Sequence, residues 1–120
     1  MTIREKQLAQ MAASRLQDFE DRAYAHVQQF WPQRCADMSK EETLQIIRSA
    51  ISNAAKYGIN SERDVVLFLN HMLSLSVDFD TNPAYPWVQS ILNDPSMTGE
   101  LKMEWLSRQT YRHLSERSEP

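Results

Sequence analysis

Apolar residues recur along this chain in steps of three and four, which is the spacing of one face of an α-helix. The longest such stripe runs through residues 4–31 and predicts a single N-terminal helix. Trp31-Pro32 ends it, because a proline pushes the residue before it out of the helical region. Such a helix either packs on the core or, since it is longer than a small core needs, docks a partner. The residues of the stripe are Leu8, Met11, Ala12, Leu16, Phe19, Ala23, Val27 and Phe30.

The second helix is marked by signals at both of its ends. Residues 32–38 form a predicted connector, and the run from Ser39 to Glu42 is a capping box. In that motif the serine oxygen accepts from the amide of the glutamate, and the glutamate carboxylate reaches back to the serine amide. The helix that follows is expected to end at Gly58-Ile59. There the glycine takes the left-handed conformation and the isoleucine packs back on the last turn.

The third helix is expected to lie at the centre of the core. Ser61 caps its start, and the segment from Val65 to Leu75 is apolar nearly all round. His71 interrupts this apolar run. We expect it to be a hydrogen-bonded structural residue rather than a catalytic base.

An acidic loop follows, and it resembles a calcium-binding loop only at its start. Asp78, Asp80 and Asn82 stand where an EF-hand places its first three ligands. Pro83 then replaces the glycine that such a loop needs, and Gln89 replaces its bidentate glutamate. We therefore expect turns in which side chains bond backbone amides. The side chains expected to do so are those of Asp80, Thr81 and Asn82.

A short helix is predicted after this loop. Pro86 suits the first turn of a helix that runs from Trp87 to Leu92. The apolar and aromatic residues around it have two possible roles. Tyr85, Trp87 and Ile91 either seal the core or, if partly exposed, anchor a partner, because Trp and Tyr dominate binding hot spots.

The last helix is predicted to run from Gly99 to Glu116, with Thr98 as its cap. Residues 115–120 are expected to form a frayed tail. The expected apolar face consists of Leu101, Trp105 and Leu114, broadened by Met103 and Leu106.

Composition supports helices over sheets. The chain has 120 residues, of which only two are glycine, and 42% are hydrophobic. A sheet with tight turns would need more glycine, and this length suits a domain that folds without disulfides or metals. The predicted fold class is therefore all-α, with a single domain over residues 1–120. We expect a compact bundle of four to five helices, with a long N-terminal helix and an acidic, aromatic, proline-containing loop before a short helix.

Charge and cysteine content narrow the class of protein. The formal net charge of −3 argues against nucleic acid and anionic membranes as partners. No apolar run reaches about 18 residues, so no membrane-spanning helix is expected, and the N-terminus leads into no apolar signal core. Cys35 is the only cysteine, which excludes an internal disulfide and favours an inert thiol over a nucleophile. A cytoplasmic location fits these features.

A search for reaction chemistry finds no known motif. The sequence contains no glycine-rich dinucleotide motif, phosphate-binding loop or HExxH zinc motif. His26, His71 and His113 are far apart in sequence, and no serine stands in a nucleophile elbow. We therefore predict no catalytic residues, no cofactor and no metal, and expect that the protein is not an enzyme.

One stretch of the chain resembles a known family. Its residues are 57–65 (YGINSERDV), 67–70 (LFLN), 79–87 (FDTNPAYPW) and 91–93 (ILN). This stretch resembles small helical accessory proteins of type VI secretion. Within that set, the chain is similar to the effector co-chaperones that work beside an adaptor chaperone when a toxin is loaded onto a PAAR spike tip. The matching residues span about a third of the chain and contain no catalytic signature.

The resemblance implies a non-enzymatic, cytoplasmic helper that binds an adaptor chaperone, a PAAR-linked effector, or both. We hypothesise that the acidic, aromatic loop contacts this partner, through Phe79, Asp80, Tyr85 and Trp87. The same residues also have a structural interpretation, in which they shape and pack the loop.

Two other functions stay open. One is an immunity protein that neutralises a cognate toxin, since an acidic surface suits mimicry of nucleic acid. The other is a small enzyme with an unrecognised acid–base pair. The sequence leaves the oligomeric state open.

Overall fold

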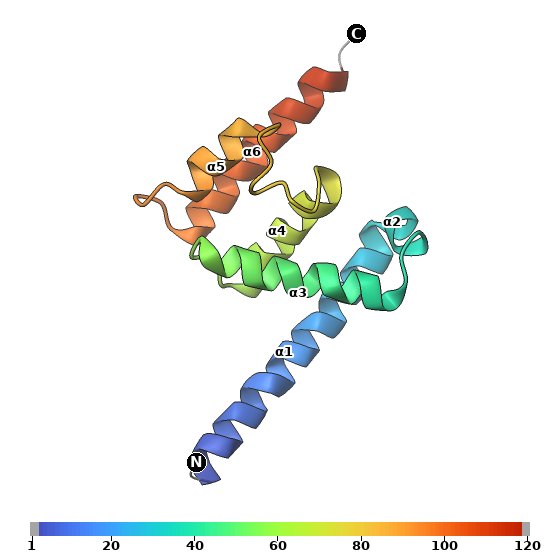
Figure 1. The fold of residues 1–120 in the computed structure, drawn as a ribbon, viewed down its shortest axis with the longest axis vertical. Coiled ribbons are helices and arrows are strands. Elements are labelled where there is room, and N and C mark those ends of the chain that lie inside the picture. Colours follow the sequence, from blue (N-terminus) through green and yellow to red (C-terminus); the bar gives the residue numbers. More distant parts are fainter. Residues whose placement is uncertain (1–2, 119–120) are drawn as a thin grey trace. The chain divides into compact units, whose positions relative to one another are not determined.

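The computed structural model describes the backbone of residues 3–118 and the side chains of residues 14–116 (Figure 1). Within these residues the secondary structure is entirely helical, without a strand, which confirms the predicted all-α class. The helices are α1 (Ile3–Phe30), α2 (Pro32–Ala36), α3 (Lys40–Lys56), α4 (Glu62–Ser74), α5 (Pro86–Leu92) and α6 (Gly99–Ser118).

Contacts between residues group the chain into two units, Met1–Arg48 and Ser49–Pro120. The boundary falls inside α3. Each unit is therefore described by itself, and the single domain expected over residues 1–120 stays a prediction.

The first unit holds α1, α2 and the start of α3. α1 ends at Phe30, as the Trp31-Pro32 pair predicts. The connector expected over residues 32–38 is instead a five-residue helix, α2, that contacts α1. Its first residue is Pro32, whose fixed backbone angle suits the first turn of a helix. The described residues therefore form six helices, where we expected four to five.

The stripe of α1 is buried at its centre and exposed at both described ends. Phe19, Ala23 and Val27 are buried, whereas Leu16 and Phe30 are exposed. The side chains of Leu8, Met11 and Ala12, which belong to the same predicted stripe, lie outside the described residues.

The predicted capping box starts α3, with one difference. The amide of Glu42 donates to Ser39 Oγ at 3.1 Å, as expected. The Glu42 carboxylate accepts from the Ser39 hydroxyl, at 3.3 Å, rather than from its amide. The serine therefore joins both interactions through one oxygen atom.

The second unit begins with the end of α3, which forms a complete Schellman motif. Gly58 has a φ of 75°, and its amide donates to the carbonyl of Ala55 at 3.1 Å. The amide of Ile59 donates to the carbonyl of Ala54 at 3.0 Å, and the Ile59 side chain is buried. These two bonds satisfy carbonyls that the helix end would otherwise leave open, which confirms the predicted C-terminus.

The start of α6 lies against this helix end. A Cβ atom on Gly99 would stand 2.6 Å from the carbonyl oxygen of Gly58 and 3.1 Å from the Cα of Ile59. Lys102, one turn further along α6, is buried and donates from Nζ to the carbonyl of Tyr57 at 2.8 Å. An ammonium group at the C-terminal end of a helix also complements the helix dipole.

The helices α4 and α5 both pack against α6 (Figure 1). Ser61 caps α4 as predicted, accepting from the amide of Asp64 at 3.2 Å, and most of α4 is buried, as its apolar sequence indicates. The buried apolar residues of this unit are Ala50, Ala54, Ile59, Val65, Phe68, Leu69, Met72, Leu73, Phe79, Val88, Leu92, Met103 and Leu106.

The orientation of α6 differs from the one expected. Leu101, Trp105 and Leu114 were expected to form its apolar face, but all three are exposed. Met103 and Leu106 are fully buried instead. The contacts at Gly99 and Lys102 fix the rotation of the helix and turn the predicted face outward.

The end of α6 also lies later than predicted. The helix continues to Ser118, so the described part of the expected tail is helical. No glycine or proline interrupts the sequence between Gly99 and Ser118. Residues 119–120 lie outside the described part.

The two glycines give a matched test of this packing. We expect Gly99→Ala to lower the free energy of unfolding by about 1–3 kcal/mol, because its methyl group forces backbone to move. Gly58→Ala should cost about 1–2 kcal/mol for a different reason, since its φ is positive while the space around it is open. Urea unfolding followed by circular dichroism measures both.

The control for this pair is Ser90→Ala, on the exposed side of α5. It should stay within about 0.5 kcal/mol of the wild type. A Gly99→Ala variant as stable as the wild type would show that α6 does not approach the end of α3 this closely.

Candidate functional site

The acidic loop between α4 and α5 is held by local side-chain bonds. The Asp78 carboxylate accepts from the Ser76 hydroxyl at 2.7 Å and from the Asn82 amide group at 3.3 Å. Asn82 Oδ1 in turn accepts from the amide of Ala84 at 2.9 Å, which confirms its predicted turn. These bonds lower the pKa of Asp78, with the Ser76 hydroxyl contributing most. The Asp78 carboxylate is therefore hydrogen-bonded to side chains of the loop itself.

Asp80 does not cap a local turn, as we had expected, but makes a bond to a distant residue. Its Oδ2 accepts from the Tyr57 hydroxyl at 2.9 Å, and its side chain is buried. Removal from water, followed by the bond to this carboxylate, raises the pKa of Tyr57 to about 12. Gln89 also donates from Nε2 to the Asp80 carbonyl at 3.3 Å. The loop is thus fastened to the end of α3 and to α5.

An aromatic cluster lies where α5 begins and α6 nears its end. The ring centroids of Trp87 and His113 are 4.7 Å apart, and that of Tyr85 lies 5.6 Å from Trp87 and 5.9 Å from His113. Trp87 Nε1 and His113 Nε2 are both buried without a hydrogen-bond partner among the described residues. The Tyr85 hydroxyl donates to the carbonyl of Leu75 at 3.3 Å. We call Tyr85, Trp87 and His113 the aromatic cluster.

The four residues predicted to contact a partner divide into two pairs. Phe79 and Asp80 are buried, and the Phe79 ring packs on Phe68 with centroids 4.9 Å apart. Tyr85 and Trp87 are half-buried and belong to the aromatic cluster. The residues that α5 buries fully are Val88 and Leu92 rather than Trp87 and Ile91. Contact with a partner stays a prediction for all four, and in this conformation only Tyr85 and Trp87 present side-chain surface for it.

The outer face of α6 carries apolar surface that the sequence interpretation missed. Leu101 is 37% exposed, Trp105 40% and Tyr111 75%. The Arg108 guanidinium lies over the Trp105 ring, 5.6 Å from its centroid. We call Leu101, Trp105, Arg108 and Tyr111 the outer α6 face. The sequence signal for this surface is Arg108, a basic residue between Trp105 and Tyr111. It was missed because the apolar residues of this helix were expected to face the core.

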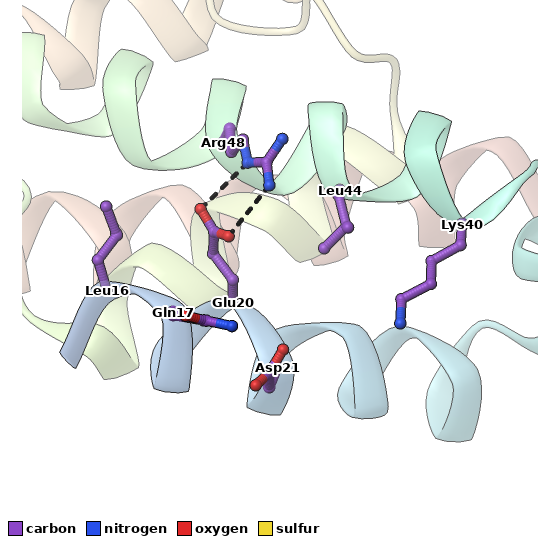
Figure 2. A pocket seen from close by; sticks show the side chains of 7 residues that line it. All are labelled: Leu16, Gln17, Glu20, Asp21, Lys40, Leu44 and Arg48. Carbon is purple, nitrogen blue, oxygen red and sulfur yellow. Dashed lines mark hydrogen bonds and ion pairs between the residues drawn. The ribbon is translucent and has the colours of Figure 1, made fainter. Parts of the chain in front are cut away.

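A groove of about 410 Å³ lies in the first unit, between α1 and the start of α3. Figure 2 shows Glu20 and Arg48 pointing at one another across it. Arg48 donates from Nε to Glu20 Oε1 at 3.1 Å and from Nη2 to Oε2 at 3.4 Å. Two of the four charged side chains that line the groove are therefore paired with each other. Its lining residues are Leu16, Gln17, Glu20, Asp21, Lys40, Leu44 and Arg48.

Two residues considered for chemistry lie in different surroundings. His71 is buried, and its Nδ1 lies 2.7 Å from the carbonyl oxygen of Leu67, to which it donates. Removal from water lowers the pKa of the imidazole, against the opposing effect of backbone bonds at Leu67 and Leu106. Cys35 is half-buried in α2 and forms no disulfide.

The described part of the chain contains no group of three His, Cys, Asp or Glu side chains arranged to hold a metal ion. None of its helices combines the length and the apolar content needed to cross a membrane.

Comparisons with models of protein families, with curated proteins and with solved structures find no match to this chain.

The bond between Tyr57 and Asp80 can be tested with a double-mutant cycle. We expect Tyr57→Phe to lower the free energy of unfolding by roughly 1–3 kcal/mol, because it leaves the buried Asp80 oxygen without a donor. Combined with Asp80→Ala, the loss should be smaller than the sum of the single losses by about 0.5–3 kcal/mol. Tyr111→Phe is the control, since it removes the same hydroxyl from an exposed ring. Strict additivity of the two single changes would contradict the bond.

The buried His71 should make stability depend on pH. Because the folded state lowers its pKa below the ordinary 6.5, the unfolded chain binds more protons between the two pKa values. The free energy of unfolding therefore rises with pH through this window. The stabilising contribution of His71 is fully present above about pH 6.5 and is lost as the pH falls toward the lowered pKa of the folded state.

Urea unfolding between about pH 5 and pH 7 measures this slope, in a range above the ordinary pKa of carboxylates. We expect His71→Asn to remove part of it, and His26→Asn, in the first unit, to leave it in place. A constant difference between wild type and His71→Asn at every pH would show that His71 contributes no proton linkage.

Proposed function

We propose that this chain is a non-enzymatic accessory protein that binds another protein through the outer α6 face. The observation that carries the proposal is the exposure of Leu101, Trp105 and Tyr111 on one helix of a chain this short. Single apolar side chains are common on protein surfaces and need no explanation. When several are grouped on one helix face, covering them with a partner removes apolar surface from water and so favours binding.

The composition of this face supports protein binding. Trp, Tyr and Arg are the residues most enriched in binding hot spots, and all three occur here within about two helical turns, between Trp105 and Tyr111. The Arg108 guanidinium already stacks on Trp105, so the pair loses little side-chain freedom when a partner arrives. Arg108 also bonds Glu104 at 2.9 Å, which further restricts its orientation.

The resemblance of residues 57–93 to type VI secretion accessory proteins suggests which partner to look for. We propose an adaptor chaperone, a PAAR-linked effector, or both, met in the cytoplasm before secretion. The aromatic cluster is a second candidate contact, through the exposed parts of Tyr85 and Trp87. The aromatic cluster and the outer α6 face both lie within the second unit.

The experiment is a tagged pull-down from the native bacterium, with identification of the co-purifying proteins by mass spectrometry. We expect the wild type to recover an adaptor chaperone and a PAAR-linked effector. The double variant Trp105→Ala/Tyr111→Ala should bind the purified partner at least about 30-fold more weakly, which corresponds to about 2 kcal/mol for the loss of hot-spot side chains.

Two controls make the result specific. Leu16→Ala removes an exposed apolar side chain from the first unit and should leave binding unchanged. Thermal melting should show that the α6 double variant is folded, because both side chains are exposed. Equal binding by wild type and double variant would overturn the assignment of the outer α6 face. Recovery of a toxin alone, together with protection of cells from that toxin, would favour an immunity protein over a co-chaperone.

A further inference from the structure

A second groove, of about 430 Å³, lies in the second unit between the start of α4 and α6. Its exposed apolar surface comes from Leu67, which is half-buried, because the other apolar lining residue, Met103, is fully buried. The other lining residues are polar or charged. They are Arg63, Asp64, Glu100, Glu104, Ser107 and Arg108.

Asp64 is the unusual residue of this groove, because one of its carboxylate oxygens is buried without a hydrogen-bond donor among the described residues. The residue is only 6% exposed. Its Oδ2 accepts from the Ser61 hydroxyl at 2.8 Å, but Oδ1 has no hydrogen-bond partner within the described residues. A buried carboxylate oxygen without a donor is costly and calls for a partner.

Arg63 lies close but does not supply that partner. Its Nη1 is 4.0 Å from Asp64 Oδ1 and 3.9 Å from Glu100 Oε1, and both distances are too long for hydrogen bonds. Neighbouring residues on a helix point in different directions, which explains why Arg63 cannot close on Asp64. The Arg63 side chain is 75% exposed, so it can yield its position to an incoming group.

The charges of the groove leave room for one more cation. Three carboxylates line it, those of Asp64, Glu100 and Glu104, against the two guanidinium groups of Arg63 and Arg108. Arg108 is already bonded to Glu104 at 2.9 Å. The lining therefore has one carboxylate more than it has guanidinium groups, and Asp64 Oδ1 is the oxygen without a hydrogen-bond donor among the described residues.

We infer that this groove binds an arginine side chain of a partner protein. The guanidinium donates to Asp64 Oδ1 and to the rim carboxylates of Glu100 and Glu104, while its methylene stem lies on Leu67. Arginine fits better than lysine, because its planar group offers five donors to several acceptors and its stem covers apolar surface. This inference rests on the proposed function only for the identity of the partner protein. The preference of the groove for a guanidinium group can be tested independently.

The test uses two peptides, Ac-Ala-Arg-Ala-NH₂ and its citrulline counterpart, which has the same shape without the charge. Both are titrated into the full-length chain at low salt, with amide NMR shifts as the readout. We expect the arginine peptide to bind with a Kd of about 1 mM, with shifts at groove residues, and to weaken as salt rises. The citrulline peptide should bind at least about tenfold more weakly.

Variants of the chain locate the binding to Asp64. Asp64→Asn should weaken binding of the arginine peptide at least about tenfold, and Glu104→Gln, on the exposed rim, about twofold to threefold. Arg63→Met should tighten binding, because it removes the competing guanidinium. Glu116→Gln removes the same charge from α6 outside the groove and should change nothing.

Several results would overturn the inference. These are equal binding of both peptides, unchanged affinity in Asp64→Asn, or shifts confined to residues outside the groove. If Asp64→Asn fails to fold, because Asp64 also bonds Ser61, the opposite changes expected for Glu104→Gln and Arg63→Met decide the matter. A silent peptide titration beside a successful pull-down would reject the groove and leave the proposed function standing.

Discussion

The approach of Gly99 to Gly58 is the constraint on which the second unit depends. A side chain on Gly99 would collide with the carbonyl of Gly58. The start of α6 can therefore lie this close to the end of α3 only because residue 99 is glycine. The Gly58 carbonyl is available there because Gly58 takes a left-handed conformation and turns the chain. Lys102 then bonds the carbonyl of Tyr57, which fixes the rotation of α6 as well as its position. The only two glycines of the chain thus act at one contact.

The same helix end also positions the acidic loop. Tyr57 offers its carbonyl to Lys102 and its hydroxyl to Asp80, so one residue joins α3, α6 and the loop. Phe79 is buried beside this bond, and Gln89 ties the loop to α5. A loop held in this way presents the aromatic cluster at a fixed place. Tyr57, Phe79 and Asp80 therefore serve the packing of the loop, which leaves Tyr85 and Trp87 with side-chain surface.

Local signals in the sequence predicted local structure well, because their bonds span only a few residues. The Schellman turn at Gly58 and the Ser61 cap are of this kind. The role of Asp80 could not be predicted, since its partner Tyr57 lies 23 residues away. The rotation of α6 was mispredicted because its apolar residues occur on two sides of the helix, and helical spacing alone does not say which side is buried. Only the tertiary contact at Gly99 decides that, and it turned Leu101 and Trp105 outward.

This rotation also joins the two surfaces that we assign to partner binding. Arg108 stacks on Trp105 in the outer α6 face and lines the groove that holds Asp64. Glu104 bonds Arg108 and stands on the rim of the same groove. A partner segment that covers Trp105 with apolar side chains can therefore place an arginine near Asp64 without leaving α6. The outer α6 face would supply most of the affinity. Asp64 Oδ1, which lacks a donor among the described residues, would supply specificity, because it is costly to bury beside any residue that cannot donate to it.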